Sequence, residues 1–175
     1  YIIEYILKKA KVLAVISLPP ETFLPSTHTK TSVIFLQKRI RKSNEPEENY
    51  QIFMAIANKV GHDKNGKTIY KMNEKGEYVL NERGERIVDD DLPEIIKRYK
   101  LFCKKRLKVM DHLGFVIRRS EIKDHIFVPS YYDPDIEQKL EEMRKSGKYD
   151  LVSIGELVKK KVLSIKTVSY THLTL

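Results

Sequence analysis

Hydrophobic residues in the first forty positions fall into one amphipathic segment and two compact apolar runs. Over residues 2–10 they recur at the spacing of one helical face, which predicts a helix. Residues 12–18 and 32–36 are short, continuous apolar runs that are rich in β-branched side chains. Such runs are typical of strands buried on both faces of an α/β sheet. The Pro-, Thr- and Ser-rich segment 19–31 between them is long for a connecting loop, which favours a functional role.

The middle of the chain alternates β-type residues with tight turns. A polar, acidic stretch at 43–49 precedes it, and residues 51–57 have the pattern of another strand. Three glycine-centred turns follow at 63–66, 73–76 and 81–84, and the last two belong to an eight-residue repeat, NEKGEYVL and NERGERIV. Glycine supplies the positive φ that hairpin turns need. The pattern therefore predicts a small β-meander.

The C-terminal half has the pattern of helices joined by short strands. Carboxylates and a proline precede an apolar helical face over residues 92–105, and Cys103 on that face is expected to be a core residue. A strand is expected at 114–119. Further helices are expected at 134–146 and 154–161, and further short strands at 151–152 and 162–165. The pattern as a whole predicts an α/β fold.

Charge and cysteine content narrow the class of protein. The 175 residues include 33 Lys and Arg against 24 Asp and Glu, a net charge of +9, and eight basic against two acidic residues leave +6 in the first 43 positions. A positive balance favours a polyanionic partner such as nucleic acid. The single cysteine cannot form an internal disulfide, and no apolar run is long enough to span a bilayer. We therefore expect a cytoplasmic protein without a membrane segment.

The loop before the second strand and the segment after it supply the candidate DNA contacts. Their hydroxyl, imidazole and cationic groups are donors to phosphate oxygens and base edges, although a solvated polar loop has the same composition. The candidates are Thr27, His28, Thr29, Lys30, Thr31, Lys38, Arg39, Arg41 and Lys42. A second basic set lies on a helix surface and is a further candidate for contact with the DNA backbone, although solvated helical faces have the same composition; it comprises Lys97, Arg98, Lys100, Lys104, Lys105, Arg106 and Lys108. Of these, Lys97, Arg98, Lys104 and Lys105 are expected to contribute less to DNA affinity than the first block. His62 has no partner cluster, so no metal site is expected.

Several segments resemble one known family. Residues 11–23 (KVLAVISLPPETF) and 29–38 (TKTSVIFLQK) resemble adenine-specific N-6 DNA methylases of the type I restriction-modification kind. The resemblance continues over 52–57 and 60–67, and YYDPD at 131–135 with IGELV farther on is similar to the entry to a target-recognition domain. In that family the first two segments end the catalytic domain, where the final two strands pair as a hairpin beside the active site.

The resemblance implies transfer of a methyl group from S-adenosylmethionine to N6 of a flipped-out adenine in double-stranded DNA. The family's cofactor and catalytic motifs lie upstream of these segments, so no catalytic or cofactor-binding residue is assigned here. SLPPE at 17–21 looks like the catalytic motif, but Leu18 is an extra residue and Glu21 replaces an aromatic one, which favours an ordinary proline-rich loop. Where some relatives stack an aromatic residue on the flipped base, this chain has Leu36, with Phe35 on the opposite face.

The resemblance also divides the chain. Residues 1–43 are expected to end a Rossmann-like methyltransferase sheet, 44–120 to form the β-meander and a helix, and 121–167 to be a mixed helical connector that begins the recognition region. Residues 168–175 are interpreted as an artefactual tail. The chain is thus predicted to be a DNA adenine methyltransferase fragment, inactive alone, with specificity and restriction subunits as partners. The alternative is a non-catalytic DNA-binding specificity module that acts with a separate methylase subunit.

Overall fold

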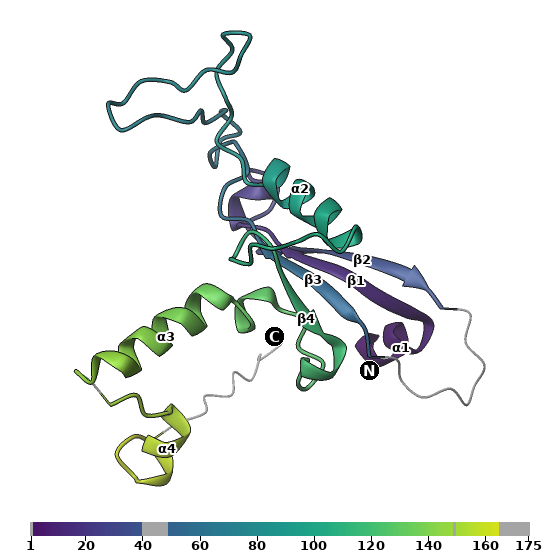
Figure 1. Ribbon diagram of the computed structural model, residues 1–175, viewed down its shortest axis with the longest axis vertical. Coiled ribbons are helices and arrows are strands. Elements are labelled where there is room, and N and C mark those ends of the chain that lie inside the picture. The colour runs from purple at the N-terminus through teal and green to yellow at the C-terminus, as the bar shows by residue number, and fades with distance from the viewer. Residues whose placement is uncertain (1, 40–48, 149, 165–175) are drawn as a thin grey trace, which may run out of the picture. The chain divides into compact units, whose positions relative to one another are not determined.

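The computed structural model describes residues 2–39, 49–148 and 150–164 (Figure 1). A four-stranded mixed sheet has the strand order β2, β1, β3, β4. Its strands are β1 (Ala10–Ser17), β2 (Ser32–Lys38), β3 (Gln51–Ile56) and β4 (Phe115–Arg118). β1 and β3 run parallel, β2 pairs antiparallel with β1, and β4 pairs antiparallel with β3. The predicted α/β class and the pairing of the first two strands are confirmed.

The helices are α1 (Ile2–Lys9), α2 (Leu92–Cys103), α3 (Pro134–Ser146) and α4 (Ile154–Lys159). The chain divides into two compact units, Tyr1–Glu137 and Gln138–Leu175. The sheet, α1 and α2 belong to the first unit, and α4 belongs to the second. β3 and β4 lie in the same sheet as β1, and the domain boundary after residue 43 stays a prediction.

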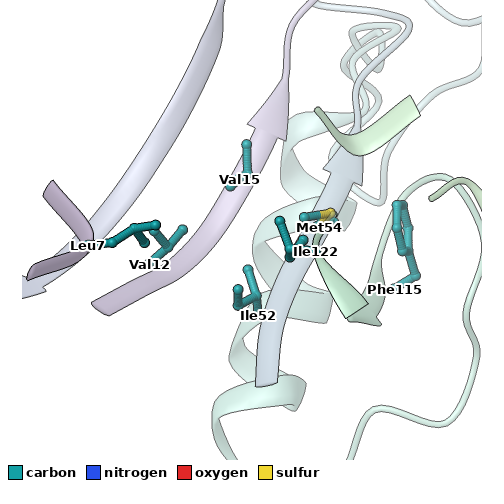
Figure 2. Packing of buried hydrophobic residues seen from close by; sticks show 7 residues of the cluster. All are labelled: Leu7, Val12, Val15, Ile52, Met54, Phe115 and Ile122. Atoms are coloured by element: carbon teal, nitrogen blue, oxygen red, sulfur yellow. The ribbon is translucent and has the colours of Figure 1, made fainter. Parts of the chain in front are cut away.

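The core lies on both faces of β3. Ile52, Phe53, Met54 and Ala55 are fully buried, and their side chains alternate between the two faces of the sheet. Ile52 and Met54 belong to a cluster with side chains of α1, β1 and β4, which Figure 2 shows. Phe53 and Ala55 belong to a second cluster, which contains Ile95 of α2. β3 is therefore covered on both faces, which a continuous apolar run requires.

A bulge explains why β1 shows no simple alternation of polar and apolar residues. Val12 pairs with Leu36 of β2, whereas Ala14 pairs with Phe35, so β1 contains one extra residue between these two pairs. Such an insertion shifts the side chains that follow it to the other face. Consequently Val12 and Val15, three positions apart, belong to the same cluster, while Ala14 belongs to the opposite one.

Residues 61–89 form an arm between β3 and α2, drawn as the looped teal segment in Figure 1. Three residues of the arm form a closed ring of backbone hydrogen bonds: the N–H of Ile69 donates to Gly61 O (2.9 Å), that of Gly61 to Asp89 O (3.1 Å), and that of Asp89 to Ile69 O (2.9 Å). A second ring joins Lys71, Val79 and Ile87 in the same way at 2.8–3.0 Å. Backbone groups are thus paired without a continuous sheet.

Identical turns connect the residues of these rings. Asp63, Asn73 and Asn81 each accept hydrogen bonds on the side-chain oxygen Oδ1 from the backbone N–H groups two and four residues later, at 2.8–3.0 Å. The glycine of each turn has φ between 77° and 80°, as the turn expectation requires. The eight-residue repeat is therefore a repeat of one turn, which places residues eight apart at the same level of the arm.

The arm contains the pairing of a β-meander and closes it further. Consecutive segments bridge as a meander requires, at Met72 with Tyr78 and at Leu80 with Arg86, while Tyr70 also bridges to Val88. The second and third turns fold the intervening chain into a ring of three segments rather than a flat ribbon. The predicted turns and the pairing across them are confirmed, and the long-range bridges that close the rings were not predicted.

Three aspartates attach the arm to the body of the molecule. Asp89 pairs with Lys59, with Nζ to Oδ2 at 2.9 Å, and Asp90 Oδ1 accepts the N–H of Leu92 at the start of α2 (2.8 Å). Asp91 Oδ2 accepts the N–H groups of both Asn58 and Lys59 at 2.9 Å. The end of β3 and the start of α2 are thereby held together.

Two other sequence expectations differ from the structure. Cys103 is exposed, because the buried side of α2 contains Ile95, Tyr99 and Phe102 and the cysteine is the last residue of the helix. Residues 151–152 and 162–164 form no strand. Residue 165 and the interpreted tail at 168–175 lie outside the described residues.

The rings predict that Gly61 and Gly66 respond differently to the same substitution. Both have φ near 80°, but an added Cβ at Gly61 would lie 2.5 Å from Val88 Cγ1, whereas the space around Gly66 is open. We expect Gly61→Ala to open the ring and raise amide hydrogen exchange at Ile69 and Asp89 by at least about tenfold, because the opening free energy falls by more than about 1.4 kcal/mol. Gly66→Ala, the matched control, has only the backbone strain, about 1 kcal/mol. Equal exchange in both variants would contradict the ring.

Candidate nucleic-acid interface

One backbone hydrogen bond joins the two ends of the loop between β1 and β2. The N–H of Leu18 donates to Thr31 O at 2.9 Å, where the β1–β2 pairing begins. A 3-10 turn, Pro20–Phe23, follows the strand, and the Thr22 hydroxyl donates to Pro19 O at 2.7 Å. The N–H of Thr27 donates to Phe23 O at 3.0 Å. These hydrogen bonds fold the first half of the loop into a local turn, whereas residues 27–30 in the second half are exposed to solvent.

The second half of this loop contains five of the candidate DNA contacts. Thr27, His28, Thr29 and Lys30 are exposed, and the hydroxyls of Thr27 and Thr29 lie 3.1 Å apart. Thr31 differs, because its hydroxyl oxygen is buried and its carbonyl is engaged by Leu18. The loop therefore presents two hydroxyls, an imidazole and an ammonium group to a ligand, all within four consecutive residues.

A crevice of about 530 Å³ lies beside the start of this loop. Its walls include Pro19 and Glu21 from the loop and residues 58–64 from the segment after β3. These segments meet because β1 and β3 run parallel, so their carboxyl ends share one edge of the sheet, and the N–H of Ala57 donates to Ser17 O at 2.9 Å. The crevices at this edge are where open α/β sheets bind ligands.

The crevice has charges of both signs. The hydrogen bond to Asp89 raises the pKa of the Lys59 ammonium group, which therefore remains cationic and paired. Hydrogen bonds from the backbone N–H groups of Lys67 and Asn65 lower the pKa of Asp63. His62 Nδ1 lies 3.0 Å from Asp63 O. The sequence pattern identified His62 and Asp63 only as turn residues, and the rule that parallel strand ends share an edge is the signal that could have placed them here.

The other candidate contacts lie at the far end of β2. Eight residue steps of about 3.3 Å each separate Thr31 from Arg39 by roughly 26 Å, and Lys38 is exposed at that end of the strand. Arg39 is packed instead: its guanidinium lies 5.2 Å from the centre of the Tyr50 ring, and two of its nitrogens are buried. Arg41 and Lys42 lie outside the described residues. The structure therefore does not gather the described candidates into one patch.

Two further sequence interpretations concern the strands of the hairpin. Ser17, which begins the motif-like SLPPE, is buried in β1 with 3% of its surface exposed, so it does not belong to the exposed loop. Phe35 and Leu36 point to opposite faces of the sheet, as expected. Phe35 stacks on Tyr99 of α2 with ring centres 5.5 Å apart, whereas Leu36 lines an apolar cavity with side chains of α1.

Among the residues that the structure describes, no group of three or more His, Cys, Asp or Glu side chains gathers where it could hold a metal ion. None of the helices in that part of the chain is long and apolar enough to cross a membrane.

Comparisons with known proteins yield one weak structural likeness. No protein-family model matches the chain, and no curated protein matches its sequence. The chain is similar to part of a solved structure described as "Structural basis underlying complex assembly and conformational transition of the type I R-M system", with 15% sequence identity and a TM-score of 0.40. The match covers 92% of this chain and 31% of that chain. A TM-score this low establishes neither a shared fold nor a function.

The packing of Arg39 predicts that it and its neighbour have separable roles. We expect Arg39→Gln to lower the free energy of unfolding by about 1 kcal/mol, because it removes the cation from the Tyr50 ring, and to change DNA affinity little. Lys38→Gln should leave stability unchanged, because this side chain is exposed. Urea unfolding followed by circular dichroism measures the first effect, and fluorescence anisotropy with a labelled duplex measures the second. Equal losses of DNA affinity in both variants would refute this assignment.

Proposed function

We propose that this chain is the C-terminal part of the catalytic domain of an adenine-N6 DNA methyltransferase, continuing toward a target-recognition region. The proposal rests on the segments that resemble that family, and one structural observation carries it further: the outer strand of the β1–β2 hairpin, β2, is apolar on both faces yet exposed. Val33, Ile34, Phe35 and Leu36 retain 41–50% of their surface exposed. The proposal accounts for this exposure.

A strand that is apolar on both faces normally lies inside a sheet. Among the described residues β2 pairs only with β1, so its other edge offers unpaired backbone groups next to apolar side chains. Isolated sheets usually protect such an edge with charges or prolines, and residues 33–36 contain neither. Further strands beside β2, with helices over both faces, would bury this surface. In the proposal these strands belong to the upstream part of a Rossmann-like methyltransferase sheet.

The described residues do not themselves fit S-adenosylmethionine, which in this proposal supplies the methyl group. A nucleotide-type cofactor needs a glycine-rich turn directly after a strand, where the backbone can approach it closely. Here Pro19 and Pro20 follow β1, and Ala57 and Asn58 follow β3. We therefore derive no chemical step from this chain. Its proposed role is to hold the DNA beside the active site through the hydroxyl, imidazole and ammonium groups of residues 27–30.

The chain alone should neither bind S-adenosylmethionine measurably nor methylate DNA, since it lacks the preorganised partners of cofactor and target amine. Isothermal titration calorimetry with the cofactor and transfer of a tritiated methyl group to duplex DNA measure both properties. Micromolar cofactor binding by this chain would show that the cofactor site lies within it and would contradict the proposal.

The exposed strand gives a direct test of the proposed catalytic domain. Coding sequence upstream of Tyr1, recovered from the source DNA and expressed as a separate segment, should restore adenine methylation when mixed with this chain. Ile34→Lys should abolish that restoration, because it places a charge on the surface that β2 buries. Met72→Lys is the control and should leave the restored methylation intact. It alters an apolar side chain of the arm that is 59% exposed, against 50% for Ile34.

An upstream segment without a cofactor motif, or a mixture that binds DNA but never methylates it, would overturn the proposal. Either result would favour the alternative, a non-catalytic specificity module that works with a separate methylase subunit. Methylation that survives Ile34→Lys would show that β2 is not where the catalytic domain joins this chain.

A further inference from the structure

The strongest concentration of charge in the described residues lies on α2 and just after it. Between residues 95 and 110 there are seven basic side chains and no acidic one; these are Lys97, Arg98, Lys100, Lys104, Lys105, Arg106 and Lys108. Arg98 is neutralised by Glu94 and Asp111, which both accept from its guanidinium. The other six side chains are exposed, and of these Lys97 also pairs with Glu94, with Nζ to Oε2 at 3.3 Å.

The end of α2 folds this segment back along the helix. The N–H of Lys105 donates to Phe102 O and that of Arg106 to Leu101 O, both at 2.8 Å, and Lys105 has φ 55°. This is a Schellman motif, which reverses the chain after a helix. Leu107 then packs against the core cluster that contains Ile95. The reversal places residues 106–109 beside the helix.

A groove of about 310 Å³ lies between the helix and the returning segment. The helix contributes Glu94, Lys97, Arg98 and Leu101, and the returning segment contributes residues 106–109. Glu94 is the carboxylate in the groove, and the hydrogen bond from Arg98 helps to lower its pKa, so it stays ionised and paired. We call this surface, with Lys104 and Lys105 at its end, the α2 groove.

We propose that the α2 groove binds the phosphate backbone of double-stranded DNA, as a contact surface separate from the loop at residues 27–31. Lys97 and Lys104 are seven residues apart and so share one helical face over about 10 Å. A duplex carries one negative charge per about 1.7 Å of axis with both strands counted, so this length of duplex holds about three phosphate charges on each strand. The groove offers flexible cations and no pocket shaped for a base, which suits backbone contact without sequence preference.

A residue choice within the Schellman motif supports this inference. The position of Lys105 favours glycine, because a left-handed backbone conformation is strained for residues with a Cβ. A lysine stands there nonetheless, and its side chain is exposed beside Lys104 and Arg106. Strain that packing does not repay is often found at functional sites. In the proposal, the charge of Lys105 contacts a phosphate, and glycine at this position would remove that contact. Lys161, at the corresponding position after α4, has φ 57° as well.

The inference takes double-stranded DNA from the proposed function, and it changes the expected distribution of DNA affinity. The sequence pattern favoured the first block, but Arg39 packs on Tyr50, and Lys30 and Lys38 lie at opposite ends of β2. The α2 groove instead gathers its cations within two turns of helix and one returning segment. We expect it to contribute more to DNA affinity than Lys30 and Lys38 together.

The test measures binding of the whole chain to a labelled duplex by fluorescence anisotropy across a salt series. Lys105→Gly, Arg106→Gln and Lys108→Gln combined should reduce the slope of log affinity against log salt by about 2 to 3, since each phosphate contact contributes about 0.9. Affinity at low salt should fall at least tenfold. The matched control removes the same charge elsewhere, through Lys139→Gln, Lys159→Gln and Lys160→Gln, all exposed, and should change the slope by less than about 1.

A single substitution separates binding from folding. Lys105→Gly should keep or raise the melting temperature, because glycine relieves the left-handed strain, while it lowers the salt slope by about 0.9. Equal losses in the groove and control variants would mean diffuse surface charge and would overturn the inference. So would polyglutamate competing as well as duplex DNA at equal charge, since the groove would then bind acidic protein segments. The mixture of this chain with the upstream segment could fail to methylate adenine while the groove variants still lose DNA affinity. That result would overturn the proposed function and support DNA binding by the α2 groove.

Discussion

Burial of β3 on both faces is the constraint on which the other elements depend. Complete burial of Ile52, Phe53 and Met54 contributes on the order of 2 kcal/mol for each side chain, and they point alternately to the two faces. A doubly buried strand needs cover on both sides, which α1 and α2 supply, and neighbours on both edges, which β1 and β4 supply. Parallel pairing with β1 then brings two strand ends, and the segments after them, to one edge of the sheet.

The arm shows a different way of satisfying the backbone. Its side chains are mostly exposed, so it has no core of its own, and its order comes from two rings of backbone hydrogen bonds and three repeated turns. Asp89, Asp90 and Asp91 connect these rings to β3 and α2 through an ammonium group and three backbone N–H groups. Local turn chemistry and a few charged contacts thus hold a segment that hydrophobic burial does not.

Packing decides which basic side chains remain available to a polyanion. Arg39 is covered by its contact with Tyr50, and Arg98 is held between Glu94 and Asp111, so neither cation is free for a ligand. The end of α2 instead leaves basic side chains exposed next to one another, because the Schellman motif brings residues 106–109 back beside the helix. Net charge therefore indicates the class of partner, while the contacts of each guanidinium and ammonium group determine where that partner can bind.

The sequence by itself determined the features that depend on near neighbours: the apolar runs of β1, β2 and β3, the helices, and the three glycine turns, whose Asp or Asn side chain bonds to backbone only two and four residues away. Only the tertiary structure decided which strands are neighbours, that the arm closes into rings, and that Cys103 is exposed. It alone joined Pro19 to residues 58–64 in the crevice and separated Lys30 from Lys38. The physical reason is that these outcomes depend on contacts between distant segments, and local spacing contains no information about which distant surfaces bury one another.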